Sequence, residues 1–273
     1  MKNQLIIFSK NRASQLNLLL DSIHKNANNI FDKINVIYKA DGDFQKAYDI
    51  LSESQTSINF IKETNFQKDT ISAIDEQYKY TTFLVDDDVF YDNVNTNIDD
   101  IISILNNTKS LCFSFRLGLN STYCHPANLH YKIGEYIEIG DYICFNYDKQ
   151  KGDLAYPLSV DGHIFRTDEI KNLIINISFV NPNTLEARLQ HYHNTPKLSS
   201  SFMCSFNKSK LVGVPVNLVN DTYKNRHGLT HFISETELNK RYLNGERISL
   251  EDIDFGEVNG PHKEVKYEFK KIN

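Results

Sequence analysis

Hydrophobic positions in the first half of the chain alternate between strand and helix spacing. Short apolar runs predict buried strands at 5–8, 34–38, 58–61, 82–85 and 111–115. Apolar residues at helical spacing predict helices across 16–23, 66–80 and 98–105. Alternation of this kind is typical of an α/β protein, in which helices cover both faces of a mostly parallel sheet.

The second half is less regular. An alternating stretch at 136–145 predicts a strand or ribbon, and a second apolar stretch predicts one at 158–165. Further helices are expected at 170–174, from Pro182 onward, and from a capping box at Ser234. In the Lys-rich end, 262–271, apolar residues alternate as in a solvated edge strand. Because no linker or repeat interrupts the chain, we expect one domain over 1–273, with halves at 1–118 and 119–273.

Composition and charge narrow the class of protein. The chain has 273 residues, 40% of them hydrophobic, a net charge of -5 and scattered basic residues, which argues against nucleic acid as a partner. The apolar run at 5–8 is too short for a signal peptide or membrane span, so a cytoplasmic location is expected, with peripheral contact at the inner face of the membrane left open. No Cys-x-x-Cys spacing occurs, so free buried thiols are predicted for Cys112, Cys124, Cys144 and Cys204.

The most informative chemical feature is Asp86-Asp87-Asp88, which directly follows the apolar run at 82–85. A buried strand that ends in carboxylates places hard oxygen ligands at the carboxyl edge of a sheet, where α/β folds bind ligands. Three adjacent ionised carboxylates repel one another, so a divalent cation would stabilise them. A solvated acidic turn is the alternative, but the apolar residues on both sides disfavour it.

Three segments in order resemble the GT-A glycosyltransferases, of a family-2-like or exostosin-like bacterial type. They are 9–12 (Ser-Lys-Asn-Arg), 41–43 (Asp-Gly-Asp) and 83–88, and the resemblance covers about residues 4–118. It implies a Rossmann-like nucleotide-binding half, a less regular acceptor-binding half, and an Asp-x-Asp element that holds Mn²⁺ or Mg²⁺ against the diphosphate of a nucleotide-sugar. Carried over by position, the nucleotide contacts are Ser9, Asn11, Arg12, Asp41, Asn65, Lys68, Asp86 and Asp87, and the metal ligands are Asp88 and Asp86.

The resemblance continues more thinly beyond residue 118. The segment 159–166 resembles the part of the family that lies beside the sugar, and it carries Asp161. Glu186 lies at a helix start where inverting members carry an acidic pair that includes the general base, so Glu186 is the first candidate base and Asp161 the second. The segment 220–228 resembles the one that returns over the diphosphate, which makes His227 a candidate metal ligand.

Together these features predict a metal-dependent glycosyltransferase. A divalent cation would stabilise the charge on the leaving diphosphate, and a carboxylate would take the proton of the attacking hydroxyl. The expected donor is a UDP-sugar, and the expected acceptor is a saccharide, a lipid-linked molecule or another hydroxyl compound, in bacterial surface polysaccharide synthesis. The irregular stretch 120–156 is expected to select the acceptor. Both inverting and retaining outcomes stay open.

Two other classes and several simpler roles stay under consideration. Haloacid dehalogenase phosphatases also end a strand with Asp-x-Asp, but their strand lies near the chain start, and Phe145 stands here where their later acid is required. A catalytically silent nucleotide- or carbohydrate-binding protein would keep the fold without turnover. Arg12 could instead cap or pair near the first helix, and Glu186 could be a solvated helix-start acid.

Overall fold

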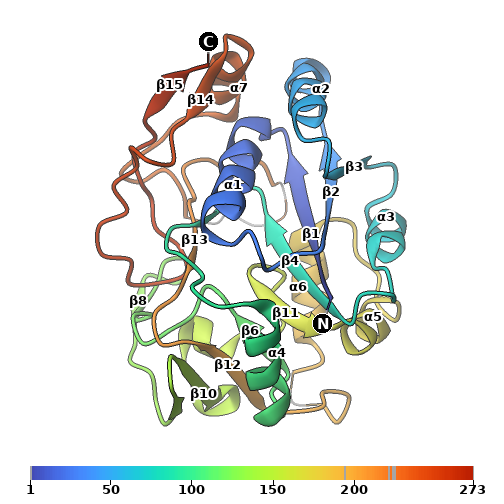
Figure 1. Ribbon diagram of the computed structural model, residues 1–273, viewed down its shortest axis with the longest axis vertical. Coiled ribbons are helices and arrows are strands. Elements are labelled where there is room, and N and C mark those ends of the chain that lie inside the picture. The colour runs from blue at the N-terminus through green and yellow to red at the C-terminus, as the bar shows by residue number, and fades with distance from the viewer. Residues whose placement is uncertain (1, 194, 221, 223–225, 273) are drawn as a thin grey trace.

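A nine-stranded mixed sheet forms the centre of the computed structural model, which describes residues 2–193, 195–220, 222 and 226–272 (Figure 1). Its strand order is β3 (Asn59–Lys62), β2 (Lys33–Lys39), β1 (Asn3–Lys10), β4 (Tyr80–Val85), β11 (His163–Arg166), β6 (Cys112–Ser114), β12 (Phe202–Phe206), β10 (Tyr142–Asn146) and β9 (Ile137–Ile139). Only β11 and β10 run against the others. The predicted α/β fold with a mostly parallel sheet is confirmed.

Helices cover both faces of this sheet because the side chains of its central strand alternate. Leu5 and Ile7 of β1 face one apolar cluster, which holds α1 (Ala13–Asn26), α2 (Gln45–Ser54) and α4 (Ile98–Asn107). Ile6 and Phe8 face the other cluster, which holds α3 (Phe66–Ala73), α5 (Thr167–Ile174) and α6 (Pro182–Gln190). Each such buried side chain contributes about 1.5–3 kcal/mol, so both layers are held mainly by apolar contact.

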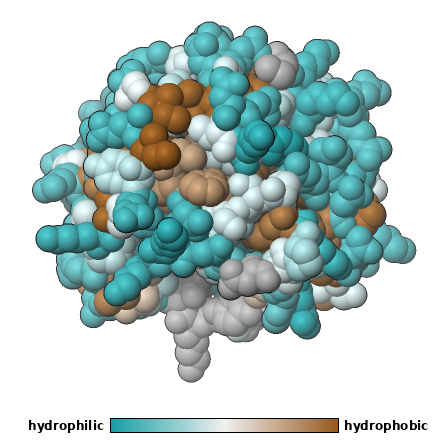
Figure 2. All heavy atoms as spheres, turned by 90° about the horizontal axis from the view of Figure 1, so that it is seen from below, coloured by the Kyte–Doolittle hydropathy of each residue, from teal (hydrophilic) through white to brown (hydrophobic). Residues whose placement is uncertain are grey.

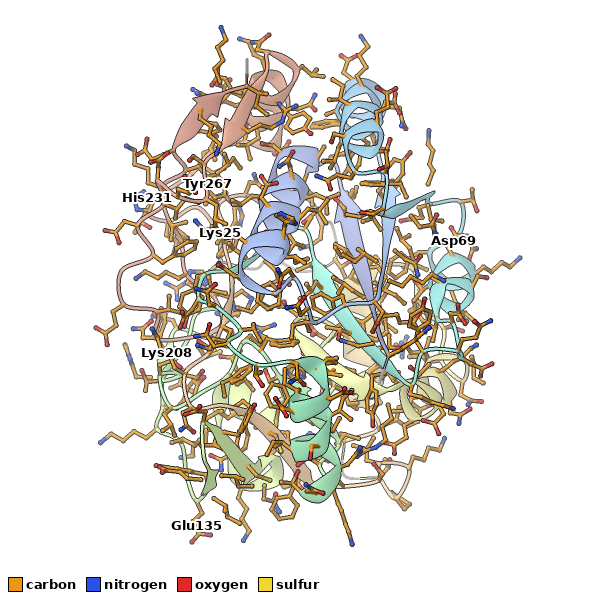
Figure 3. All side chains as sticks on the ribbon, viewed as in Figure 1. Lys25, Asp69, Glu135, Lys208, His231 and Tyr267 are labelled. Atoms are coloured by element: carbon orange, nitrogen blue, oxygen red, sulfur yellow. The ribbon has the colours of Figure 1, made fainter. Side chains whose placement is uncertain are left out.

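A third apolar cluster packs the C-terminal part of the chain against α1. It includes Val89 of β5 (Asp88–Phe90), Val212 of β13 (Leu211–Gly213) and Leu238 of α7 (Glu235–Leu243). Val265 and Tyr267 are buried in it, and Tyr267 lies beside α1 (Figure 3). The prediction of a solvated edge strand at the C-terminal end was therefore wrong over this stretch, because the alternating apolar residues pack into a core. Within this stretch the short β15 (Phe269–Lys271) pairs with β14 (Glu246–Ile248).

The structure differs from the sequence expectation in two strand regions and in two helices. Strands β12 and β13 were not predicted, and β11 begins only at His163 instead of at 158. The helix expected over 66–80 ends at Ala73, because Ile74 adopts an extended backbone and the chain then turns before β4. Helix α2 was not predicted, although Ala47, Tyr48 and Leu51 form its buried side. The short strands β7 (Tyr123–Cys124) and β8 (Leu129–His130) pair with each other. Short 3-10 helices are also present, at Gly42–Phe44, Tyr147–Lys149 and Gly152–Ala155.

Surface and thiol properties agree with the composition. The four cysteines are buried and free, as predicted. The face seen from below is mostly hydrophilic, with small groups of apolar residues (Figure 2). Among the residues that the structure describes, each helix is too short or too polar to span a bilayer.

One buried side chain, Arg12, joins three distant parts of the fold. Its Nε donates to Asn217 Oδ1 (2.8 Å) and its Nη2 donates to the Asn217 carbonyl (2.6 Å), 205 residues along the chain. Its Nη1 lies 3.1 Å from Asp86 Oδ1 and 3.0 Å from Asp87 Oδ2. Burial alone would lower the pKa of this guanidinium, but Asp87 and Asp86 raise it above its usual range, so Arg12 stays charged.

Replacing Arg12 by Ala should destabilise the whole domain. The substitution leaves the buried Asp86 and the half-buried Asp87 without their cation, and losing one partner of a buried ion pair costs about 3–5 kcal/mol. Urea unfolding followed by circular dichroism measures this loss. The matched control is Lys25→Ala, which breaks the exposed Lys25–Glu251 pair and should change the free energy of unfolding by less than about 1 kcal/mol. Equal effects of the two substitutions would contradict the role given to Arg12.

Candidate functional site

A cleft of ≈ 790 Å³ opens at the carboxyl ends of β1, β2 and β4. Ser9 and Lys10 close β1, Lys39 closes β2, and 86–88 follow β4. Because β11 runs antiparallel to β4, the residues just before β11, including Asp161, reach this same edge. The sheet direction therefore collects side chains from both halves of the sequence around one space.

The cleft brings together most of the residues singled out from the sequence. Its lining includes Ser9, Arg12, Asp86, Asp87, Asp88, Asp161, Glu186 and His227. Residues 221 and 223–225 of the segment around His227 lie outside the described residues. The other candidates, Asn11, Asp41, Asn65 and Lys68, do not belong to that lining.

The residues outside the lining have local structural contacts. The Asn11 amide donates to Asp41 Oδ2 (3.0 Å) and accepts from the Asp41 backbone (2.8 Å), so this pair fastens the loops after β1 and β2. Asn65 caps α3 by accepting from the Lys68 backbone N–H (3.0 Å). The structure thus gives Asn65 a capping role and places Lys68 on the exposed first turn of α3.

Asp86 is fixed by the loop that precedes α1. Its Oδ2 accepts from Ser9 Oγ (2.9 Å) and the Lys10 backbone (3.0 Å), while its Oδ1 accepts from Arg12. Beside it, burial raises the pKa of Asp87 to about 6, although the Arg12 charge opposes this effect. Asp86 therefore shapes the loop, and Asp87 holds a proton more readily than an ordinary aspartate does.

Asp88 and Asp161 form a buried carboxyl pair between β4 and β11. Burial raises the pKa of Asp88 well above its usual range, and the charge and hydrogen bond of Asp161 raise it further. Burial also acts to raise the pKa of Asp161, but its ion pair with Arg116 outweighs that effect and holds this pKa low. Asp88 therefore binds a proton more readily than its neighbour Asp161 does.

This pair fits a divalent cation only when a ligand supplies further oxygen atoms. Among the residues described, no group of three or more His, Cys, Asp or Glu side chains is arranged to hold a metal ion. Asp161 Oδ1 and His262 Nδ1 are nevertheless buried without a hydrogen-bond partner, and His262 Nε2 lies 3.8 Å from Asp161 Oδ2. Mg²⁺ is commonly held by one or two carboxylates together with substrate phosphates, which is the arrangement that this donor set allows.

Glu186 stands on the first turns of α6, beside the segment that carries Asp161. Asn181 caps this helix in a reciprocal capping box with Thr184, and Pro182 occupies its first position, so the local sequence fixes where the helix begins. Glu186 Oε1 accepts from Ser159 Oγ (2.6 Å) and the Val160 backbone (3.1 Å). Burial raises the pKa of Glu186, and the Ser159 bond opposes the increase.

Two cleft residues were not found by the sequence reasoning. Arg116 is buried, pairs with Asp161, and lies 3.4 Å from Ser159 Oγ, and it directly follows the strand segment at 111–115. Because Arg116 directly follows a predicted strand, its position could have indicated a residue at the carboxyl edge of the sheet. His262 lies in the C-terminal segment, which is joined to β13 by an isolated bridge at Gly213, and no periodic pattern marked it.

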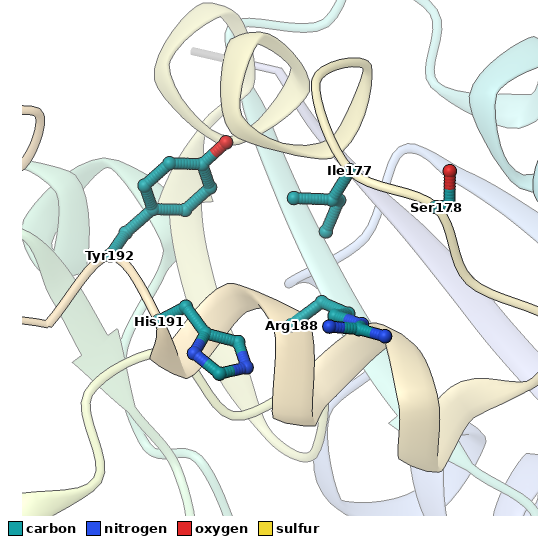
Figure 4. A pocket seen from close by; sticks show the side chains of 5 residues that line it. All are labelled: Ile177, Ser178, Arg188, His191 and Tyr192. Carbon is teal, nitrogen blue, oxygen red and sulfur yellow. The ribbon is translucent and has the colours of Figure 1, made fainter.

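A second, smaller hollow lies beside the C-terminal part of α6. Its volume is ≈ 490 Å³, and it is lined by Ile177, Ser178, Arg188, His191 and Tyr192 (Figure 4). None of the candidate carboxylates borders it. The larger cleft is therefore the candidate active site.

Comparison with known proteins gives one match in sequence. The chain is 29% identical over 257 residues to the bifunctional glycosyltransferase pgtA of Dictyostelium discoideum, and the match covers 81% of this chain and 33% of that protein. The chain thus spans about a third of the length of the curated relative that it matches. No family model matches the chain.

Similarity to solved structures is weak. The crystal structure of S. aureus TarS 1–349 in complex with UDP is 18% identical, with a TM-score of 0.47, and the match covers 77% of this chain and 60% of that one. The 4-diphosphocytidyl-2C-methyl-D-erythritol synthase of Anaerococcus prevotii is 10% identical, with a TM-score of 0.38, and coverage of 78% and 90%. Both TM-scores lie below 0.5, so neither similarity assigns the fold. The fold is defined by the strand order of the chain itself. In sequence, the chain is similar over about four fifths of its length to part of a glycosyltransferase, which confirms the predicted resemblance to a glycosyltransferase.

Proposed function

We propose that the chain transfers a sugar from a nucleotide-sugar to a hydroxyl acceptor. The observation that carries this proposal is the convergence of 86–88, Asp161 and Glu186 in one cleft at the carboxyl edge of the sheet. The sequence similarity to a glycosyltransferase supports it. The phosphatase alternative loses support because its nucleophile would be Asp86, whose carboxylate is held by Ser9, Lys10 and Arg12.

One end of the cleft suits a nucleoside. Phe8 and Ile37 are directly opposite each other on β1 and β2, and the Phe66 ring lies 5.0 Å from the Phe8 ring, between centroids. Lys39 and Glu63, at the carboxyl ends of β2 and β3, line the same part of the cleft. An apolar slot with a few polar groups is the usual form of a small-molecule site, and a planar base fits it. A UDP-sugar is the first donor to test.

At the carboxylate end, Asp88 and Asp161 would hold Mn²⁺ or Mg²⁺ together with the donor diphosphate. When bound there, the cation would stabilise the negative charge on the departing nucleotide. Arg116 holds Asp161 in its ionised form and engages it in an ion pair, which leaves Glu186 as the better proton acceptor. We therefore assign Glu186 as the general base for the acceptor hydroxyl. The metal dependence and a role in surface polysaccharide synthesis stay predictions.

Removing the Asp88 carboxylate should abolish turnover. Asp88→Ala deletes one of the two oxygen donors proposed for the cation, so donor binding in Mn²⁺ should weaken while the fold is kept. Isothermal titration with a panel of nucleotide-sugars, with and without Mn²⁺, measures binding, and donor hydrolysis measures turnover. The control is Asp252→Ala, an exposed aspartate outside the cleft, which should bind and react as the unmodified protein does. Full activity of Asp88→Ala would refute the proposed cation site, and a protein that binds donors without any turnover would favour the silent alternative.

Replacing Glu186 by Gln should lower the rate while donor affinity stays nearly unchanged. Loss of a general base costs about 10²–10⁴-fold in rate. Because the base must be ionised and its pKa is raised, the rate of the unmodified enzyme should fall as the pH is lowered through that raised pKa. Initial rates from pH 5 to pH 9 should show this acidic limb, and Glu186→Gln should lack it. Parallel losses of rate and donor affinity would instead make Glu186 a binding residue.

A further inference from the structure

We propose that the acceptor is a saccharide, and that one of its sugar rings binds on a wall of the cleft formed by the part of the sequence between β6 and β11. This wall, called here the acceptor wall, consists of Cys124, His125, Pro126, Gly152, Asp153 and Tyr156. It belongs to the irregular part of the chain that the sequence indicated for acceptor selection. The inference rests on the proposed glycosyl transfer and adds the substrate class and the residues that recognise it.

Tyr156 gives the acceptor wall an accessible aromatic ring. Its side chain lines the cleft and is 37% exposed, whereas Phe8 and Phe66 at the nucleoside end are 3% and 5% exposed. The C–H groups on one face of a pyranose carry partial positive charge and pack on the negative face of an aromatic ring. Tyr156 also lies three residues before Ser159 in the sequence, and the Ser159 hydroxyl donates a hydrogen bond to Glu186. A sugar on this ring therefore lies near the proposed base.

Asp153 adds a hydrogen-bond acceptor beside that ring. The Tyr131 hydroxyl donates to Asp153 Oδ2 (3.3 Å), and this orients the carboxylate at the cleft. Gly152 makes the arrangement possible, because it has a positive φ of 60° and a Cβ there would lie 2.5 Å from the Tyr131 ring. Carboxylates accept hydrogen bonds from sugar hydroxyls, so Asp153 and Tyr156 supply the polar and apolar contacts that a pyranose requires.

The other side of the acceptor wall is fixed by the C-terminal half. Arg226 Nη1 donates to the His125 carbonyl (2.9 Å) and to the Tyr123 hydroxyl (2.9 Å). Glu264 lies 3.7 Å from His125 Nε2 and accepts from the backbone of 229–231. A wall held from both sides loses little entropy when a ligand binds, which favours a specific ligand over loose apolar contact. Its mixture of ring, carboxylate and imidazole suits a hydroxyl-rich ligand better than a lipid chain.

Binding of methyl glycosides tests the inference directly. Saturation-transfer NMR with a panel of methyl hexosides and N-acetylhexosaminides, with and without UDP and Mn²⁺, measures their affinities. Tyr156→Ala should weaken the best ligand by about tenfold, since an aromatic contact contributes up to about 1.5 kcal/mol. Tyr156→Phe should retain binding, and Asp153→Asn should weaken it. The matched control is Tyr136→Ala, a tyrosine that is 38% exposed outside the cleft lining, which should bind as the unmodified protein does.

The outcomes separate this inference from the proposed function. Circular dichroism of each variant establishes that the fold is kept, and UDP titration reports the donor end independently. The inference is overturned if no glycoside binds, if Tyr156→Ala and Tyr136→Ala bind equally well, or if a serine peptide or decyl phosphate binds instead. Glycoside binding without any nucleotide binding or donor turnover would leave the acceptor wall intact and refute the glycosyl transfer.

Discussion

Burial of like charges is the constraint on which this structure depends. Four aspartates, 86–88 and Asp161, meet at one edge of the sheet, where desolvation penalises every ionised carboxylate. Two buried guanidinium groups offset most of that cost. Arg12 pairs with Asp86 and Asp87, and Arg116 pairs with Asp161. Burial and the Asp161 charge raise the pKa of Asp88 well above its usual range, and Arg116 opposes this only in part, so a cation arriving with a diphosphate would be favoured there.

The same arrangement separates the chemical roles of two neighbouring carboxylates. Asp161 and Glu186 lie on adjoining parts of the cleft wall, but Asp161 faces Arg116, whereas Glu186 faces the Ser159 hydroxyl and a backbone N–H. An ion pair lowers the proton affinity of a carboxylate, and burial without a full countercharge raises it. In the proposed reaction, this difference in environment favours Glu186 as the proton acceptor and Asp161 as the anionic partner, a choice that the sequence left open.

Sequence reasoning succeeds where local chemistry determines structure. The strands β1 to β4 and most helices follow from periodicity, whereas β12 was not predicted. Residues 86–88 mark the candidate site because a buried strand ends there. Contacts between residues that are far apart in the sequence were not predicted. Arg12 was recognised as a site residue, but its two bonds to Asn217 span 205 residues, and no local pattern encodes them. His262 escaped notice for the same reason, since only tertiary packing of the C-terminal segment brings it to the cleft.

Strand direction explains why the second half of the chain can complete a site that the first half begins. The pattern of apolar residues predicts a strand over 158–165, but it does not fix which way the strand runs. Because β11 is antiparallel to β4, its amino end lies beside the carboxyl end of β4, with His163 opposite Phe83. A parallel strand in this position would carry Asp161 to the far edge of the sheet. The antiparallel β11 therefore places Asp161 beside Asp88. Helix α6 then brings Glu186 to the Val160 backbone, in the segment that precedes β11.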